Sequence, residues 1–217
     1  MDKSFWLDCW DNKTIGFHEQ KPNALLVSHF RYIKKNMHIQ SIFLPLCGKT
    51  NDISWLKKQS FNIIGCELSE IAVRELFDEL HITPKITTLA SHKCYEANNI
   101  KIYVGDFFLL TPELLGKIDL IYDRAALIAL PEQTRTDYAQ KLTYLTNNAC
   151  QLLIVFEYPN NLIKGPPFSV SEVEVSRLYS ENYSFKIRET ILSSTFNNPI
   201  KSTRETLYFL NKKKVST

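Results

Sequence analysis

Residues 41–67, SIFLPLCGKTNDISWLKKQSFNIIGCE, decide the fold because they contain two short apolar runs separated by a helical segment. The first run, residues 42–46, closes at a glycine turn, as expected of a buried strand. Residues 52–59 have helical character, and the second run, residues 61–66, ends at Glu67. A strand, a helix and a second strand in this order predict the start of a parallel sheet.

The same alternation continues toward the C-terminus. Ser69 is placed to cap a helix that runs to about Leu80, and the polar residues 83–99 are predicted to be irregular. The later elements are strands over residues 100–104, 118–122 and 151–156, helices over residues 131–147 and 172–180, and an antiparallel strand pair over residues 184–192 and 204–210. The pattern predicts the α/β class, with a mostly parallel seven-stranded sheet, an antiparallel C-terminal strand pair and helices on both faces.

Ahead of this core, residues 1–38 combine aromatic and charged side chains with a break at Gly16 and an amphipathic stretch over residues 23–35. Two helices joined by a loop are the simplest interpretation. A chain of 217 residues, 44% of them hydrophobic, is long enough for one substantial core and short for two. We therefore expect a single domain over residues 1–217, with a helical extension over residues 1–38.

Charge and hydropathy restrict the partners and the location of the protein. The 26 Lys and Arg residues are nearly balanced by 23 Asp and Glu residues, whereas a nucleic-acid surface needs a coherent basic face. No apolar stretch approaches the roughly 20 residues that span a bilayer, and the N-terminus lacks the apolar segment of a signal peptide. We expect a cytoplasmic protein that binds neither nucleic acid nor membranes.

Cysteine and histidine spacing argues against disulfides and metals. The five cysteines are odd in number and far apart, without a C-x-x-C pair, and the five histidines show no metal-ligand spacing. We predict a reducing compartment and no metal site. Cys47 has Lys49 as its only adjoining cation, so a reactive thiolate is not expected there.

The predicted parallel strands end in residues suited to ligand binding. In open α/β sheets, ligands lie beyond the carboxyl ends of the strands. The residues at four of these ends are Leu46-Cys47-Gly48, Glu67, Gly105-Asp106-Phe107 and Asp123-Arg124. A ligand lying across that edge of the sheet would meet all four.

Glu67 is the most informative of these residues. It follows the turn at Gly48 by about 20 residues, the spacing at which a carboxylate accepts both hydroxyls of a ribose and disfavours a 2′-phosphate. The turn lacks the G-x-G-x-x-G that approaches a pyrophosphate, and Phe43 stands where a P-loop needs its first glycine. The pattern favours a ligand with a ribose and no pyrophosphate. A solvent-facing acid at a helix start is the alternative interpretation.

Seven short motifs occur along the chain: Trp6 with Trp10, Ile15-Gly16-Phe17-His18, Pro45-Leu46-Cys47-Gly48-Lys49, Gly65-Cys66-Glu67-Leu68-Ser69-Glu70, Gly105-Asp106-Phe107-Phe108, Tyr122-Asp123-Arg124-Ala125-Ala126-Leu127 and Gly165-Pro166-Pro167-Phe168. In this order they resemble the thiopurine S-methyltransferase family, and in length its bacterial branch. The resemblance covers about residues 5–180. Seven ordered motifs at compatible spacings are specific, whereas any one of them alone is weak.

The resemblance implies a Rossmann-like class I methyltransferase that uses S-adenosylmethionine. Phe17 would lie over the methyl acceptor, with Trp6 beside it. The acceptor implied is a small aromatic or heterocyclic thiol; halide, thiocyanate and selenium or tellurium species are alternatives, and so is a cofactor-binding domain without catalysis. We expect a monomer. The residues implied in cofactor binding are Trp6, Trp10, Leu46, Glu67, Asp106, Phe107 and Arg124.

Charge suggests a role for several of these side chains. The face of Trp10 suits a sulfonium cation, Asp106 is placed to accept a hydrogen bond from an adenine amine, and Phe107 would cover the ring. Arg124 is the predicted catalytic residue, because its planar fork suits the cofactor carboxylate or an acceptor thiolate. A heterocyclic thiol arrives largely ionised, so no strong base is expected and Asp123 is the fallback.

Structural alternatives stay open at four of these positions. Trp6 and Trp10 lie four residues apart and could form a core pair. Asp106 could serve as a helix N-cap, and Arg124 could be the ion-pair partner of Asp123 or of Glu157. Residues 193–203 match the family poorly, so no acceptor-binding residue is assigned there.

Overall fold

The computed structural model describes residues 3–159, 163–192 and 203–213. Its backbone divides into two compact units, Met1–Asp119 and Leu120–Thr217, which are described separately. The poorly matching segment 193–203 lies outside the described residues, apart from Thr203.

The first unit is built on strands in the order β3-β4-β5-β2-β1. Strands β1, β2 and β5 pair in parallel, and β4 and β3 continue the sheet as an antiparallel hairpin. Because helices lie on both of its faces, β1 is buried throughout and β2 is buried beyond its first residue. The bounds are β1 (Ser41–Leu44), β2 (Asn62–Glu67), β3 (Lys85–Thr88), β4 (Lys93–Ala97) and β5 (Ile100–Val104).

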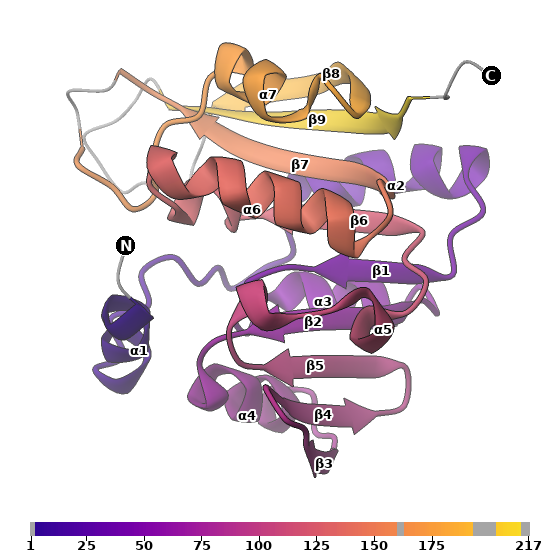
Figure 1. Cartoon of the computed structure of the whole chain (residues 1–217), viewed down its shortest axis with the longest axis vertical. Coiled ribbons are helices and arrows are strands. Elements are labelled where there is room, and N and C mark those ends of the chain that lie inside the picture. Colours follow the sequence, from indigo (N-terminus) through magenta and orange to yellow (C-terminus); the bar gives the residue numbers. More distant parts are fainter. Residues whose placement is uncertain (1–2, 160–162, 193–202, 214–217) are drawn as a thin grey trace. The chain divides into compact units, whose positions relative to one another are not determined.

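The helices of the first unit begin at polar caps. The side chains of Asn23, Thr50 and Ser69 accept hydrogen bonds from backbone N–H groups in the first turns of α2, α3 and α4. In Figure 1, α3 and α4 lie behind the sheet of this unit and α5 lies in front of it. The bounds are α1 (Lys3–Asp11), α2 (Ala24–Asn36), α3 (Asn51–Lys57), α4 (Glu70–Glu79), the 3₁₀ turn η1 (Phe107–Leu109) and α5 (Pro112–Leu115).

The second unit has the strand order β6-β7-β9-β8. Strands β6 and β7 are parallel, whereas β9 runs antiparallel to both β7 and β8. Helices α6 and α7 lie on the same face of these strands (Figure 1). The bounds are β6 (Leu120–Arg124), η2 (Leu127–Ala129), α6 (Glu132–Leu145), β7 (Cys150–Glu157), α7 (Glu172–Tyr179), β8 (Tyr183–Leu192) and β9 (Arg204–Lys212).

The predicted fold class is confirmed, including the antiparallel C-terminal pair, but the strand count is larger. The described residues form nine strands instead of seven, because residues 83–99, predicted to be irregular, contain β3 and β4. All four residues of β3 are exposed, so no apolar periodicity marks this edge strand in the sequence. Main-chain pairing with β4 defines it instead.

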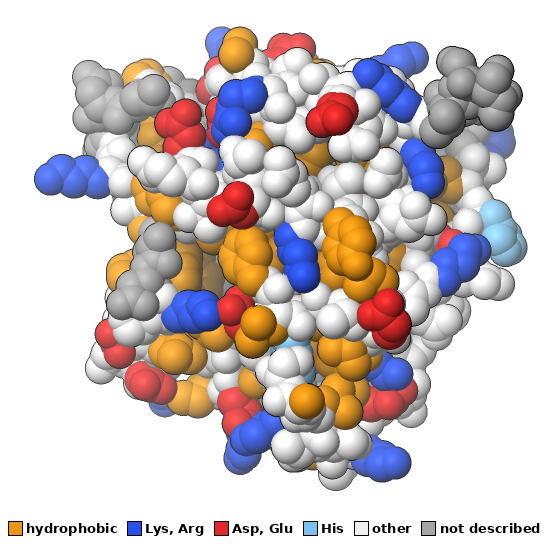
Figure 2. Space-filling view, viewed as in Figure 1, with side chains coloured by type: hydrophobic (Ala, Val, Ile, Leu, Met, Phe, Trp, Pro, Cys, Tyr) orange, Lys and Arg blue, Asp and Glu red, His pale blue; other side chains and the backbone are white. Residues whose placement is uncertain are grey.

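Charged side chains of both signs are distributed over the surface. On the face drawn in Figure 2, basic and acidic side chains are interspersed, with hydrophobic side chains among them. This distribution agrees with the near balance of charge in the sequence. Among the helices that the structure describes, none combines the length and apolar character that a membrane span requires.

Candidate active site

The turn after β1 contains Leu46, Cys47 and Gly48 and lies at the carboxyl edge of the first unit's sheet. Leu46 and Gly48 both adopt left-handed backbone, with φ of +47° and +52°. The N–H of Cys47 donates to the carbonyl of Cys66 over 3.0 Å, which joins the turn to β2. A Cβ at Gly48 would lie 3.2 Å from Cζ2 of Trp10, so the missing side chain allows the indole to pack on the turn.

Glu67 lies at the end of β2 and is only 6% exposed. Its Oε2 accepts a hydrogen bond from the N–H of Gly48 at 2.7 Å, and its Oε1 accepts one from the N–H of Ser69 at 2.8 Å. Burial raises the pKa of this carboxyl, while the backbone N–H groups oppose that shift. The carboxylate therefore braces the glycine turn against the start of α4, and the solvent-facing interpretation is wrong.

Asp106 lies beside Glu67 at the same edge, because the N–H of Gly105 donates to the carbonyl of Glu67 over 2.9 Å. Its Oδ1 caps η1 by accepting from the N–H of Phe108 at 3.0 Å. Its Oδ2 forms an ion pair of 2.6 Å with Nζ of Lys3, whose side chain is 60% exposed. The capping interpretation is thus confirmed, and it uses only one of the two carboxylate oxygens.

His92, in the loop between β3 and β4, contacts the main chain of the turn that carries Asp106. Its Nε2 lies 3.1 Å from the main-chain carbonyl of Asp106, which can only accept, so Nε2 carries the proton. The hydroxyl of Ser91 lies 2.8 Å from Nδ1 and fixes the ring. A Cβ at Gly105 would lie 2.6 Å from the imidazole, so this glycine permits the close contact.

An aromatic cluster of Trp6, Trp10 and Phe17 borders this edge. Phe17 contacts both indoles edge-to-face, with ring centroids 5.6 Å from Trp6 and 5.5 Å from Trp10. Trp10 is buried, while Trp6 and Phe17 are half-buried. Helix α1 lies beyond the carboxyl ends of β2 and β5 (Figure 1), in agreement with the contacts of Trp10 with Gly48 and of Lys3 with Asp106.

The two cysteines at this edge are not activated. Cys47 and Cys66 are both buried. Burial, together with the nearby Glu67, raises the pKa of each thiol well above its ordinary value. Neither side chain is suited to act as a thiolate nucleophile.

In the second unit, Arg124 ends β6 and is half-buried. The next residue, Ala125, has a left-handed φ of +66°. The preceding Asp123 is fully buried and holds the loop, since its Oδ1 accepts from the N–H of Leu127 at 3.1 Å and its Oδ2 from the hydroxyl of Tyr138 at 2.7 Å. Asp123 thus anchors the segment that carries Arg124, which favours a structural role over that of a base.

Burial of Asp123 gives a testable dependence of stability on pH. Burial raises the pKa of Asp123 from 3.8 to about 6, so between these values the folded state binds more proton than the unfolded chain and the free energy of unfolding falls as pH rises. Asp123→Asn should remove this contribution. In urea unfolding, the difference in stability between wild type and variant should change between pH 4 and pH 7 by on the order of 1–3 kcal/mol. A difference that does not vary with pH would contradict the assigned pKa.

Comparison with known proteins identifies the family. The family model for thiopurine S-methyltransferase matches residues 1–214. The chain belongs to the thiopurine S-methyltransferase family. It is 48% identical over 184 residues to a thiopurine S-methyltransferase of Xanthobacter autotrophicus, covering 84% of this chain and 86% of that one, and 40% identical over 217 residues to that of Acinetobacter baylyi, covering 98% and 100%.

Solved structures with low sequence identity show the same fold. A 1,6-didemethyltoxoflavin-N1-methyltransferase of Burkholderia thailandensis has a TM-score of 0.65 at 10% identity, covering 97% of this chain and 87% of that one. The magnesium protoporphyrin IX methyltransferase of Synechocystis has a TM-score of 0.62 at 14% identity, covering 97% and 100%. The family and fold confirm the predicted enzyme class: this thiopurine S-methyltransferase family member is a class I methyltransferase that uses S-adenosylmethionine.

In this family member, the first unit brings most of the predicted residues to one edge of its sheet. The turn, Glu67 and Asp106 are joined by main-chain hydrogen bonds, and Trp10 packs on the turn. Phe107 follows Asp106 and is buried. Arg124 belongs to the second unit, where it also ends a parallel strand.

Two residues at this edge of the first unit, and one buried arginine of the second unit, were not predicted from the sequence. Lys3 pairs with Asp106 across 103 positions of the chain, and His92 lies in a segment predicted to be irregular. Arg135 lies buried on α6, where a charged residue reads as part of the exposed face of an amphipathic helix. Only the tertiary structure shows what these side chains contact.

Proposed function

We propose that this enzyme transfers the methyl group of S-adenosylmethionine to the sulfur of a small aromatic or heterocyclic thiol. The observation that carries the proposal is the family match over residues 1–214, which includes every predicted site residue. The curated relatives from Xanthobacter autotrophicus and Acinetobacter baylyi are both named thiopurine S-methyltransferase. We propose that the chain acts as a single catalytic domain and as a monomer in the cytoplasm.

The edge of the first unit fits the adenosine part of the cofactor. Glu67 accepts the backbone N–H groups of Gly48 and Ser69, with a further contribution from Leu68, and an ionised carboxylate has about four acceptor positions, so it can still accept from the ribose. The capping bond of Asp106 uses Oδ1 only. Its Oδ2 pairs with Lys3, and once this ion pair breaks, Oδ2 can accept a hydrogen bond from the adenine amine. Phe107 would cover the adenine ring, while Leu46 offers its backbone at the turn.

The aromatic cluster fits the charged end of the cofactor and the acceptor. S-adenosylmethionine held there would supply an electrophilic methyl carbon, so that the acceptor sulfur would form the new S–C bond in line while the old S–C bond breaks and S-adenosylhomocysteine leaves. A sulfonium cation over the face of Trp10 or Trp6 gains roughly 0.5–2 kcal/mol from the ring quadrupole. Phe17, which contacts both indoles, would stack on the acceptor ring. Alignment of the two reactants between aromatic walls would then account for most of the rate increase.

Arg124 would supply the positive charge that the reaction needs. A guanidinium beside the acceptor favours its thiolate form, because an opposite charge lowers the pKa of a thiol. This removes the need for a strong general base. Asp123 is held by Leu127 and Tyr138, in keeping with a supporting role.

An acceptor panel with radiolabelled S-adenosylmethionine tests the proposal. Thiophenols and mercaptopyrimidines should be methylated at the sulfur, with kcat/KM at least about tenfold above that for iodide, thiocyanate or selenite. Isothermal titration should show S-adenosylhomocysteine binding. If iodide or a selenium species is methylated faster than every thiol, that species becomes the assigned substrate in place of the thiol. Cofactor binding without turnover of any acceptor would indicate a non-catalytic domain.

A further inference from the structure

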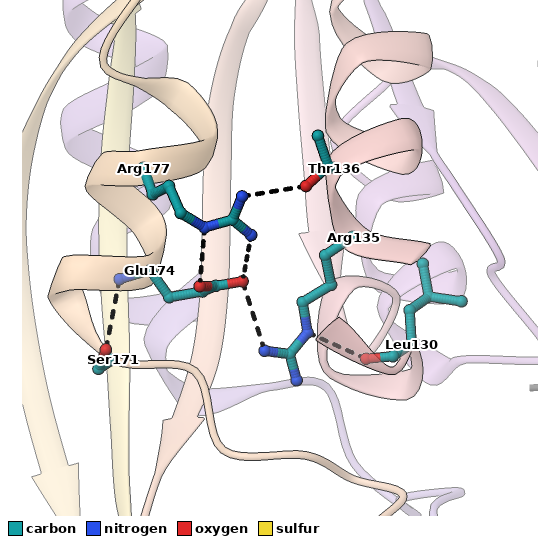
Figure 3. Close-up of polar contacts among 6 residues, drawn as sticks. All are labelled: Leu130, Arg135, Thr136, Ser171, Glu174 and Arg177. Atoms are coloured by element: carbon teal, nitrogen blue, oxygen red, sulfur yellow. Dashed lines mark hydrogen bonds and ion pairs between the residues drawn. The ribbon is translucent and has the colours of Figure 1, made fainter. Parts of the chain in front are cut away.

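A buried arginine lies outside the predicted site, on the first turn of α6. The side chain of Arg135 is 5% exposed, and a guanidinium is rarely buried unless its donors are paired. Its Nε donates to the carbonyl of Leu130 at 2.9 Å, and its Nη1 lies 3.7 Å from the carboxylate of Glu174 on α7. Figure 3 shows Arg135 and Arg177 approaching this carboxylate from two helices.

The same guanidinium contacts the loop that follows β7. Its central carbon lies 5.8 Å from the ring centroid of Phe168. The same ring is packed on Gly165, where a Cβ would clash with Cδ1 of Phe168. Phe168 also donates its N–H to the carbonyl of Ile128 at 2.7 Å, which joins this loop to η2.

Arg135 therefore contacts both loops at the carboxyl ends of the parallel pair β6 and β7. One loop runs from Arg124 through η2 to Leu130, and the other includes residues 163–170. The second loop is held to the end of β7 at a further point, since the hydroxyl of Tyr158 donates to the carbonyl of Pro167 at 2.5 Å.

We infer that Arg135 is a positioning residue that fixes the loop after β7 against the loop of Arg124 and thereby sets the affinity for the methyl acceptor. The inference rests on the proposed function, in which Arg124 faces the acceptor. A planar guanidinium can donate along one edge to Leu130 and Glu174 while its face covers a phenyl ring. A lysine at this position would keep the charge but not this geometry.

The chain offers a matched control for this residue. Arg177 binds the same carboxylate through Nη2 at 2.9 Å and Nε at 3.2 Å, and it also donates to the hydroxyl of Thr136 at 3.0 Å. Figure 3 shows the guanidinium of Arg177 bound to Glu174 on its own helix and to Thr136 on α6. Arg135→Gln and Arg177→Gln therefore each remove a partner of Glu174, but only the first releases the loops.

Hydrogen exchange tests the positioning without any assumption about the substrate. In Arg135→Gln, the amide of Phe168 should exchange about tenfold faster than in wild type, because its hydrogen bond to Ile128 loses the support of the arginine. Arg177→Gln should stay within about twofold of wild type. Equal exchange rates at Phe168 in the two variants would overturn the inference, whether or not the enzyme methylates thiols.

Kinetics then test the consequence for the acceptor. With the best thiol of the panel, Arg135→Gln should raise the acceptor KM about tenfold, within the roughly 10²-fold that an ångström of misplacement can cost. The affinity for S-adenosylhomocysteine should stay within about twofold, and Arg135→Lys should not restore the KM. An unchanged KM, or a full rescue by lysine, contradicts the inference. Absence of thiol turnover by wild type would instead count against the proposed function, and exchange at Phe168 would still decide the role of Arg135.

Discussion

Replacing Glu67 with alanine should weaken the binding of S-adenosylhomocysteine by about 100-fold or more. The carboxylate is buried and fixed by the N–H groups of Gly48 and Ser69, so it is already oriented before a ligand arrives. Two hydrogen bonds from ribose hydroxyls to a charged acceptor are each worth about 1.5–3 kcal/mol. Isothermal titration of the folded variant measures the loss directly.

The variant also loses interactions within the protein. The N–H groups of Gly48 and Ser69 would lack their acceptor, at a cost of about 1–3 kcal/mol for each group that stays buried and unpaired. Binding must therefore be measured well below the thermal midpoint of the variant. If the variant is less stable but binds S-adenosylhomocysteine as well as wild type, Glu67 only stabilises the turn and does not bind the ribose.

Glu70 provides a matched control for this experiment. It lies three residues further along the chain at the start of α4, and its carboxylate pairs with Lys93, Arg74 and Tyr95. These hydrogen bonds lower the pKa of Glu70 to about 2, so it is a charged side chain near the site with other partners. Glu70→Ala should leave S-adenosylhomocysteine affinity within about twofold, and a loss equal to that of Glu67→Ala would refute the ribose assignment.

The core elements of the fold were predictable because their sequence patterns are set by burial. The central residues of β1 and β2, 42–44 and 63–66, carry no polar side chain, since both faces of the sheet are covered, and the predicted cap Ser69 is the residue that caps α4. Strand β3 carries no such pattern, because an exposed edge strand is held by its main chain. The strand was missed because an exposed edge strand needs no apolar side chains to hold it in the sheet.

The part of the candidate site that could be predicted is the part formed by residues at the ends of consecutive parallel strands. Glu67 and Asp106 follow parallel strands, and adjacent parallel strands end at one edge, so their proximity could be expected. The ion pair between Lys3 and Asp106 depends on where α1 packs, and no local spacing encodes that position. For the same reason, the partners of Arg135 could not be inferred from α6 alone.

Replacing Arg124 with glutamine should lower kcat/KM for a thiol acceptor by about 100-fold near neutral pH, the scale seen when one charge-stabilising donor is lost from an active site. Arg124 ends β6, and its loop is anchored by the buried carboxylate of Asp123, so the guanidinium is carried on a fixed segment. Without this cation, the pKa of the bound thiol should rise. The loss in kcat should therefore shrink at high pH, where the bound acceptor ionises without help.

The pH profile separates the two roles open to Arg124. If the guanidinium stabilises the thiolate, Arg124→Gln moves the acidic limb of the kcat profile, which reports the pKa of the bound thiol, to higher pH, and Arg124→Lys returns it toward wild type because the charge is restored. If the guanidinium instead holds the cofactor carboxylate, the profile keeps its position while the affinity for S-adenosylhomocysteine falls. Arg177→Gln, which removes an arginine of the second unit from an ion pair with Glu174, should change neither quantity. An unshifted profile with unchanged cofactor affinity would leave Arg124 no part in either step, and the positive charge that favours the thiolate would have to come from another residue.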